Sequence, residues 1–93
     1  MELNIKAKKL INLFSALSDA SRFQIFSLLL RKQNICVSDL GGLLGLTTSA
    51  ASQHLKILEQ SGLTLRERHG QKICYKVNTA DSLVSCLIDI LEK

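Results

Sequence analysis

Hydrogen-bonding side chains gather on one face of a helix that the sequence predicts after residue 47. They are Thr48, Ser49, Ser52, Gln53 and Lys56. The opposite face is apolar, since Ala51, Leu55 and Leu58 recur at helical spacing. Hydroxyls, an amide and one cation can meet the donors and acceptors that base edges present in the DNA major groove. The pattern predicts a recognition helix; the alternative is an ordinary helical hairpin with a solvated face.

A tight turn separates this helix from a shorter one, and together they predict a helix-turn-helix over residues 38–60. The shorter helix carries an apolar stripe of Leu40, Leu43 and Leu44. We expect Ser38 to cap its start, Gly45 to end it and Thr47 to cap the second helix. Gly41 and Gly42 lie inside it, where each costs up to about 1 kcal/mol relative to alanine. A close helix crossing would account for one of them, whereas the sequence gives no reason for the other.

After Gly62 the apolar period changes from helical to two, which is typical of β-strands. The alternating apolar residues are Leu63, Leu65, Ile73, Tyr75 and Val77. His69-Gly70-Gln71 supplies a turn, so residues 63–77 predict a β-hairpin. A hairpin directly after a helix-turn-helix is the wing of a winged helix. Its tip would offer Arg68, His69, Gln71 and Lys72 to the DNA backbone or minor groove.

Cations concentrate around these two elements, although the net charge of the chain is only +4. Residues 54–76 carry five Lys or Arg against two Glu, whereas residues 77–93 carry one Lys against three acidic residues. Such local density favours phosphate binding and makes affinity fall steeply with salt. The alternative is an ordinary solvated lysine face.

Three further helices complete the predicted architecture. Apolar spacing predicts helices over residues 3–17, 20–31 and 79–92, with Ser18 or Asp19 capping the second, and residues 35–37 are a candidate edge strand. We therefore expect a mainly α fold with a small β-hairpin wing. It is a winged helix-turn-helix of about five helices and two to three short strands, forming a single domain over residues 1–93.

The last predicted helix is apolar nearly all round. Its polar residues follow one narrow stripe of Asp81, Ser85, Asp89 and Glu92. So wide an apolar surface predicts that helices 3–17 and 79–92 pair with those of a second copy. A symmetric homodimer would place two recognition helices about one DNA turn apart, matching a palindromic operator. The alternative is a helix packed on the core of its own chain.

Composition and length exclude several classes of protein. No apolar run approaches the ~18 residues of a membrane span, and the first residues lack the apolar core of a signal peptide, so we expect no membrane partner and a cytoplasmic location. Three cysteines without an export signal are expected to be thiols. No catalytic constellation appears at a useful spacing, and a chain of 93 residues leaves no second lobe to form a cleft, so we expect no enzyme.

Three segments resemble the ArsR/SmtB family of metal- and stress-responsive repressors. They are LFSALSDASRFQIFSLLL, NICVSDLGGLLGLTTSAASQHLKILEQSGL and RERHGQKICYKV, and the resemblance spans about residues 10–80. It implies a winged-helix homodimer that blocks transcription until an inducer weakens its binding to DNA. It also places His54 on the recognition helix beside the residues named above.

The resemblance implies sensor sites that this chain matches only in part. At the metal-binding box, Cys36 and Asp39 are kept, but Ser38 stands where arsenic and cadmium sensors often have a second cysteine. Soft metals and arsenite favour two or three thiolates. Cys86 lies on the last helix, where some members carry one thiol of a redox pair, and Lys72 and Lys76 beside Cys74 would lower the pKa of its thiol. The alternative for each cysteine is inert packing.

The sequence therefore predicts a dimeric, sequence-specific DNA-binding repressor that needs no cofactor to bind DNA. A metal, a metalloid or a thiol-reactive signal is the candidate inducer. The alternatives are a repressor with no ligand of its own, or a winged helix that serves as a protein-interaction module.

Overall fold

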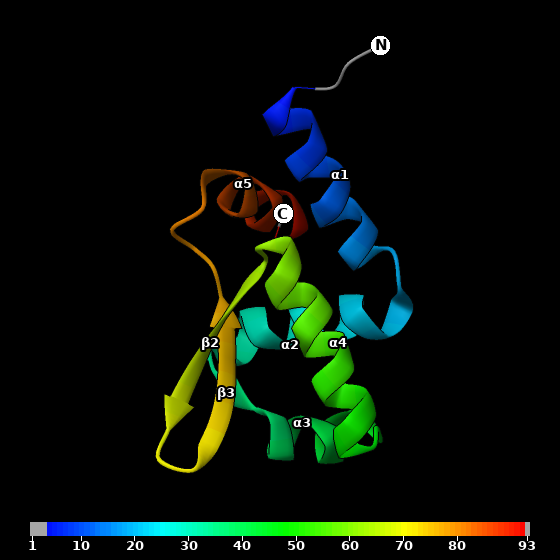
Figure 1. Cartoon of the computed structure of the whole chain (residues 1–93), viewed down its shortest axis with the longest axis vertical. Helices are drawn as coiled ribbons and strands as arrows, with labels where there is room; N and C mark the ends of the chain where they lie inside the picture. The colour runs from blue at the N-terminus through cyan, green and yellow to red at the C-terminus, as the bar shows by residue number, and fades with distance from the viewer. Residues whose placement is uncertain (1–3, 93) are drawn as a thin grey trace.

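The computed structural model describes residues 4–92, which form five helices and three strands. In chain order they are α1 (Ile5–Leu17), α2 (Ala20–Lys32), β1 (Ile35–Cys36), α3 (Val37–Leu44), α4 (Thr48–Ser61), β2 (Thr64–His69), β3 (Lys72–Val77) and α5 (Ser82–Leu91). The strands form one antiparallel sheet in the order β1-β3-β2. Figure 1 shows the β2–β3 hairpin running along one side of the molecule, with its tip at the same end as α3. The expected winged helix-turn-helix fold is confirmed.

Short polar side chains fix where the helices begin. Asn4, Asp19, Thr47 and Asp81 lie at the N-cap positions of α1, α2, α4 and α5 and accept hydrogen bonds from backbone N–H groups two or three residues on. Each such bond satisfies a donor that the helix leaves without a partner. The predicted cap at Thr47 is confirmed, and Asp19 rather than Ser18 caps α2. The predicted start of the first helix at residue 3 lies outside the described residues.

The turn between α3 and α4 explains one of the two glycines. Gly45 ends α3 in the left-handed region at φ 68°, and the N–H of Leu46 then donates to the carbonyl of Gly41 at 2.9 Å. A Cβ on Gly41 would lie only 2.8 Å from the carbonyl oxygen of Leu46. The close approach is thus to the turn that leads into α4. A Cβ on Gly42 would meet nothing within 4 Å, and nothing in the structure explains this second glycine.

The core is mainly aliphatic and is formed by side chains of all five helices and the sheet. Its fully buried large side chains are Leu13, Ile25, Phe26, Leu29, Leu40, Leu55, Leu58, Leu63 and Val84. Ala51, Leu55 and Leu58 bury the inner face of α4, as predicted. Because one face of α4 is held in the core, its other face is fixed outward.

Several local predictions were wrong. Ser38 lies inside α3, because the helix begins at Val37 with Cys36 at the cap position, and the last helix begins at Ser82 instead of residue 79. In β2 the expected alternation is displaced: Thr64 is buried and Leu65 is 41% exposed. The cause is the corner before the strand, where Leu63 is buried and its N–H donates to the carbonyl of Leu58 at 3.1 Å.

Candidate nucleic-acid interface

The outward face of α4 carries the side chains that the sequence predicted for base contacts. Thr48, Ser49, Ser52, Gln53 and Lys56 are all exposed. They lie on a helix whose buried face fixes its rotation about its own axis. Their hydroxyls, amide and ammonium group are therefore presented together on one rigid surface.

A groove of about 950 Å³ runs between α4 and the wing, which comprises residues 63–77. Thr48, Ser52 and Lys56 line it from α4, and Arg66, Gln71 and Lys72 line it from the wing. Both sides thus contribute polar and cationic side chains, beside apolar ones such as Ile73 and Tyr75. Predicted residues of the recognition helix and of the wing thus share one surface.

Ion pairs divide the cations of this surface into two groups. Arg66 Nε lies 3.7 Å from Glu59 Oε2, and Lys76 pairs with Glu67. The hydrogen bond from Lys76, followed by that from His69, holds the pKa of the Glu67 carboxyl below its ordinary value. Within residues 4–92 the exposed Lys56, Arg68 and Lys72 have no acidic partner within 4.0 Å. These three cations are available to phosphate groups.

His54 lies apart from the other predicted residues of α4. Its Nδ1 is 3.9 Å from Asp19 Oδ2 and 3.5 Å from a guanidinium nitrogen of Arg22, at the start of α2. Arg22 Nε also donates to the carbonyl of Ala16 at 2.7 Å. The Arg22 backbone N–H lowers the pKa of Asp19, and the Arg22 and His54 charges act in the same direction. In this structure His54 connects α4 to α2.

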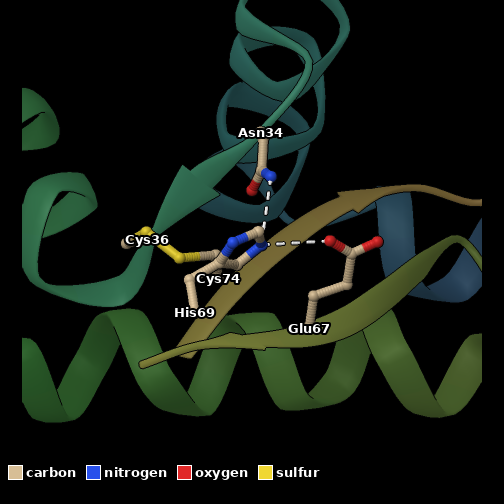
Figure 2. Close-up of a disulfide and its surroundings, with 5 residues drawn as sticks. All are labelled: Asn34, Cys36, Glu67, His69 and Cys74. Atoms are coloured by element: carbon tan, nitrogen blue, oxygen red, sulfur yellow. Dashed lines mark hydrogen bonds and ion pairs between the residues drawn. A yellow bond between two sulfur atoms is a disulfide. The ribbon is translucent and has the colours of Figure 1, made fainter. Parts of the chain in front are cut away.

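Two of the three cysteines form a disulfide, so the expectation of three thiols was wrong. Cys36 of β1 and Cys74 of β3 are directly opposite each other in the antiparallel ladder, and their Cα atoms are 3.7 Å apart. Their sulfurs are bonded (Figure 2). A bonded Cys74 does not titrate, so the expected effect of Lys72 and Lys76 on its pKa does not apply in this state. Cys86 is an exposed free thiol on α5.

The disulfide also bears on the expected metal box. The sulfur of Cys36 is bonded to Cys74, and Asp39 is exposed on α3. Across residues 4–92 no group of three or more His, Cys, Asp or Glu side chains lies close enough to hold a metal ion. In the bridged state Cys36 and Asp39 therefore do not fit a thiolate metal site.

The sequence contains both cysteines but gives no indication that they pair with each other. Cys36 was placed in a candidate edge strand and Cys74 in the hairpin, 38 residues apart. What pairs them is the sheet order, in which β1 lies against β3 instead of β2. In the part of the chain that the structure describes, no helix is both long enough and apolar enough to span a membrane.

Comparisons with known proteins place the chain in a family. The model of the ArsR family of bacterial regulatory proteins matches residues 19–64, from the cap of α2 to the first residue of β2. The uncharacterised HTH-type transcriptional regulator YbzH of Bacillus subtilis is 36% identical in an alignment that covers 71% of this chain and 80% of YbzH. The chain belongs to the ArsR family.

Other members of the ArsR family match it over different shares of their length. The transcriptional repressor SmtB homolog of Synechocystis is 36% identical over 72 residues, 77% of this chain. The chain spans only about half, 54%, of that relative. The solved structure of HlyU from Vibrio cholerae has a TM-score of 0.83 at 29% identity and covers 96% of this chain and 94% of HlyU, which is named a transcriptional activator. The matched family consists of regulatory proteins and not of enzymes.

Proposed function

We propose that this ArsR-family chain is a dimeric, sequence-specific DNA-binding regulator that represses transcription. The observation that carries the proposal is the polar outward face of α4 beside a wing whose Arg68 and Lys72 have no acidic partner among the described residues. Side chains on α4 would read base edges, and the wing cations would bind phosphates. Repression needs no further domain, because a protein bound at a promoter excludes other proteins from that DNA.

The dimer interface that we propose is formed by α1 and α5. These helices are joined by an ion pair between Lys9 and Asp81 (Figure 1 shows them at the end of the molecule opposite the wing tip). Several large apolar side chains on them are exposed, among them Ile5, Ile11, Phe14, Ile90 and Leu91. Burying this patch against a second copy would remove it from water. A two-fold axis there would present two copies of α4 to a palindromic operator.

The test begins with selection of duplexes from a random DNA library, followed by measurement of the dissociation constant as a function of salt. Lys56, Arg68 and Lys72 in two protomers make six cations, so the slope of the logarithm of the association constant against log[salt] should be about −5. Lys72→Ala should reduce its magnitude by about 2 and weaken all duplexes alike.

Gln53→Ala is the matched change on α4. It should weaken the selected duplex by about 1–3 kcal/mol, leave random duplexes unaffected and preserve the slope. Equal losses on selected and random duplexes would contradict base readout by α4. Failure to enrich any duplex, together with a flat salt dependence, would favour the alternative in which this face binds a protein.

DNA binding itself requires no cofactor in this proposal, and the protein would work in the cytoplasm, where bacterial DNA lies. For the signal that controls DNA binding we favour the redox state of the cysteines over a metal ion. In the bridged state Cys36 and Asp39 do not fit a thiolate metal site, whereas the sulfurs of Cys36 and Cys74 are already joined. A repressor without a ligand of its own would keep its DNA affinity under metals, metalloids and oxidants alike.

A further inference from the structure

The Cys36–Cys74 disulfide joins the two parts of the proposed DNA-binding surface. Cys36 occupies the cap position of α3, the first helix of the helix-turn-helix, and Cys74 lies in the middle of β3. Figure 2 shows the bond crossing from β1 to β3. It is the covalent link between the start of the helix-turn-helix and the wing.

Apart from the burial of Ile35 and Tyr75 in the core, few other contacts hold this junction together. β1 has only two residues, and its ladder with β3 consists of the pairs Ile35–Tyr75 and Cys36–Cys74. At the cap of α3, Cys36 makes no side-chain hydrogen bond. The nearest polar link is a 3.5 Å contact between Asn34 Nδ2 and His69 Nε2, both exposed (Figure 2). Opening the disulfide would leave β1 held to the wing by one short ladder, one weak polar contact and the core packing of Ile35.

The two cysteines differ in their exposure to solvent. Cys74 is 1% exposed, because β3 is the central strand, whereas Cys36 at the edge of the sheet is only half-buried. A small solute therefore reaches the sulfur of Cys36 first. Proteins that work in a reducing cytoplasm rarely keep permanent disulfides, and those that form there are usually transient or redox-sensing.

We propose that Cys36 and Cys74 form a reversible thiol–disulfide exchange site for low-molecular-weight disulfides, and that the oxidised bridge clamps the wing to the helix-turn-helix. In the forward step the Cys36 thiolate attacks one sulfur of RSSR, forms a mixed disulfide and releases RS⁻. The Cys74 thiolate then attacks the Cys36 sulfur, closes the bridge and releases a second RS⁻. The two leaving thiolates take up the two protons that the cysteines lost. Two molecules of RSH reverse the sequence.

The regulatory consequence rests on the proposed function. Clamping the wing restricts its motion relative to α4, so the oxidised protein presents both contact regions in one arrangement before DNA arrives. Preorganisation of this kind raises affinity by reducing the ordering that binding requires. The oxidised form should bind the selected duplex at least about fivefold more tightly than the reduced form, at the lower end of typical coupling between sites.

The site itself is tested without DNA, in a Cys86→Ser background so that only the pair can titrate. The protein is equilibrated with reduced and oxidised glutathione, quenched with acid, alkylated and counted for free thiols by mass spectrometry. We expect one two-electron transition, from one tenth to nine tenths oxidised over an about 80-fold change in [GSSG]/[GSH]². Hydrogen exchange at residues 35–37 and 73–75 should be at least about tenfold faster in the reduced form.

Cys36→Ala in the same background is the matched control, chosen because Cys36 is half-buried and Cys74 lies in the core. It should show no thiol–disulfide transition, and its hydrogen exchange rates should match those of the reduced parent at every glutathione ratio. A bridge that never opens or never forms in glutathione would overturn the proposal. A difference of less than twofold in hydrogen exchange between the oxidised and reduced forms would also overturn it. If no duplex is enriched in either state, the DNA-binding function fails, while titration and exchange still decide the clamp.

Discussion

The close approach of α3 to its following turn predicts opposite effects for the same substitution at adjacent positions. Gly41 and Gly42 both lie within α3, and neither has a positive φ. Replacing a helical glycine by alanine stabilises a protein by about 0.5–1 kcal/mol when the added methyl meets nothing. Gly42→Ala should obtain this gain in full, since its Cβ would face open space.

At Gly41 the same gain is opposed by a steric clash. The new Cβ would lie 2.8 Å from the carbonyl oxygen of Leu46, whereas ordinary contact begins at 3.4 Å. The obstacle is backbone, so the turn itself must move by several tenths of an ångström. Overpacking of this kind costs about 1–3 kcal/mol, which leaves Gly41→Ala destabilised by about 1 kcal/mol and about 2 kcal/mol less stable than Gly42→Ala.

Thermal and urea unfolding of the two variants would measure this difference, at one protein concentration and one redox state because dimerisation and the disulfide both affect stability. For a chain of this size, about 2 kcal/mol corresponds to a difference in Tm of about 8–16 °C. Gly42→Ala should also keep the DNA affinity of the parent, whereas Gly41→Ala should weaken it by displacing the start of α4. Equal stability of the two variants would refute the assignment of Gly41 to a close contact with Leu46.

Three further outcomes are expected. Asp81→Asn keeps a side chain able to cap α5 but loses the charge that pairs with Lys9. Because that pair and the α5 N–H groups lower the pKa of Asp81, the variant should have a lower Tm than the parent at pH 7. The difference in Tm should vanish as the pH falls through the lowered pKa. The disulfide closes a loop of 38 residues, so its reduction should lower the free energy of unfolding by up to about 4 kcal/mol in urea titrations. The free energy of unfolding of Cys36→Ala should not change when reductant is added. Phe14→Glu places a charge on an exposed apolar side chain of α1, so sedimentation should show a folded monomer; an unchanged dimer would place the interface elsewhere.

Local patterns made the polar outward face of α4 predictable. The inner stripe of α4, its cap at Thr47 and the turn at Gly45 depend on residues within one helix of each other, and all were found where expected. The hairpin was predicted from its turn residues and from the two-residue period of its apolar side chains. These features need no knowledge of how distant segments meet.

Features that join distant segments were missed. The disulfide depends on β1 pairing with β3, which no residue near Cys36 or Cys74 encodes by itself. His54 has the helical position expected of a DNA contact, but its ring meets Asp19 from another helix. Thr64 was expected to face outward, yet the corner after α4 buries both it and Leu63. For the disulfide and for His54 the partner lies many residues away, so local periodicity could not identify it.

A small rotation of the wing about the corner at Gly62 is amplified into a large displacement of its tip. Gly62 ends α4 at φ 93°, and its carbonyl accepts a hydrogen bond from Asn78 Nδ2 at 3.0 Å, so the wing's two ends are held at a fixed fulcrum. From there six residues of β2 extend about 20 Å to the tip. A tilt of about 10° at the fulcrum would displace the tip by about 3.5 Å, which exceeds the length of a hydrogen bond. Modest angular freedom at one glycine is therefore enough to decide whether the tip touches a phosphate.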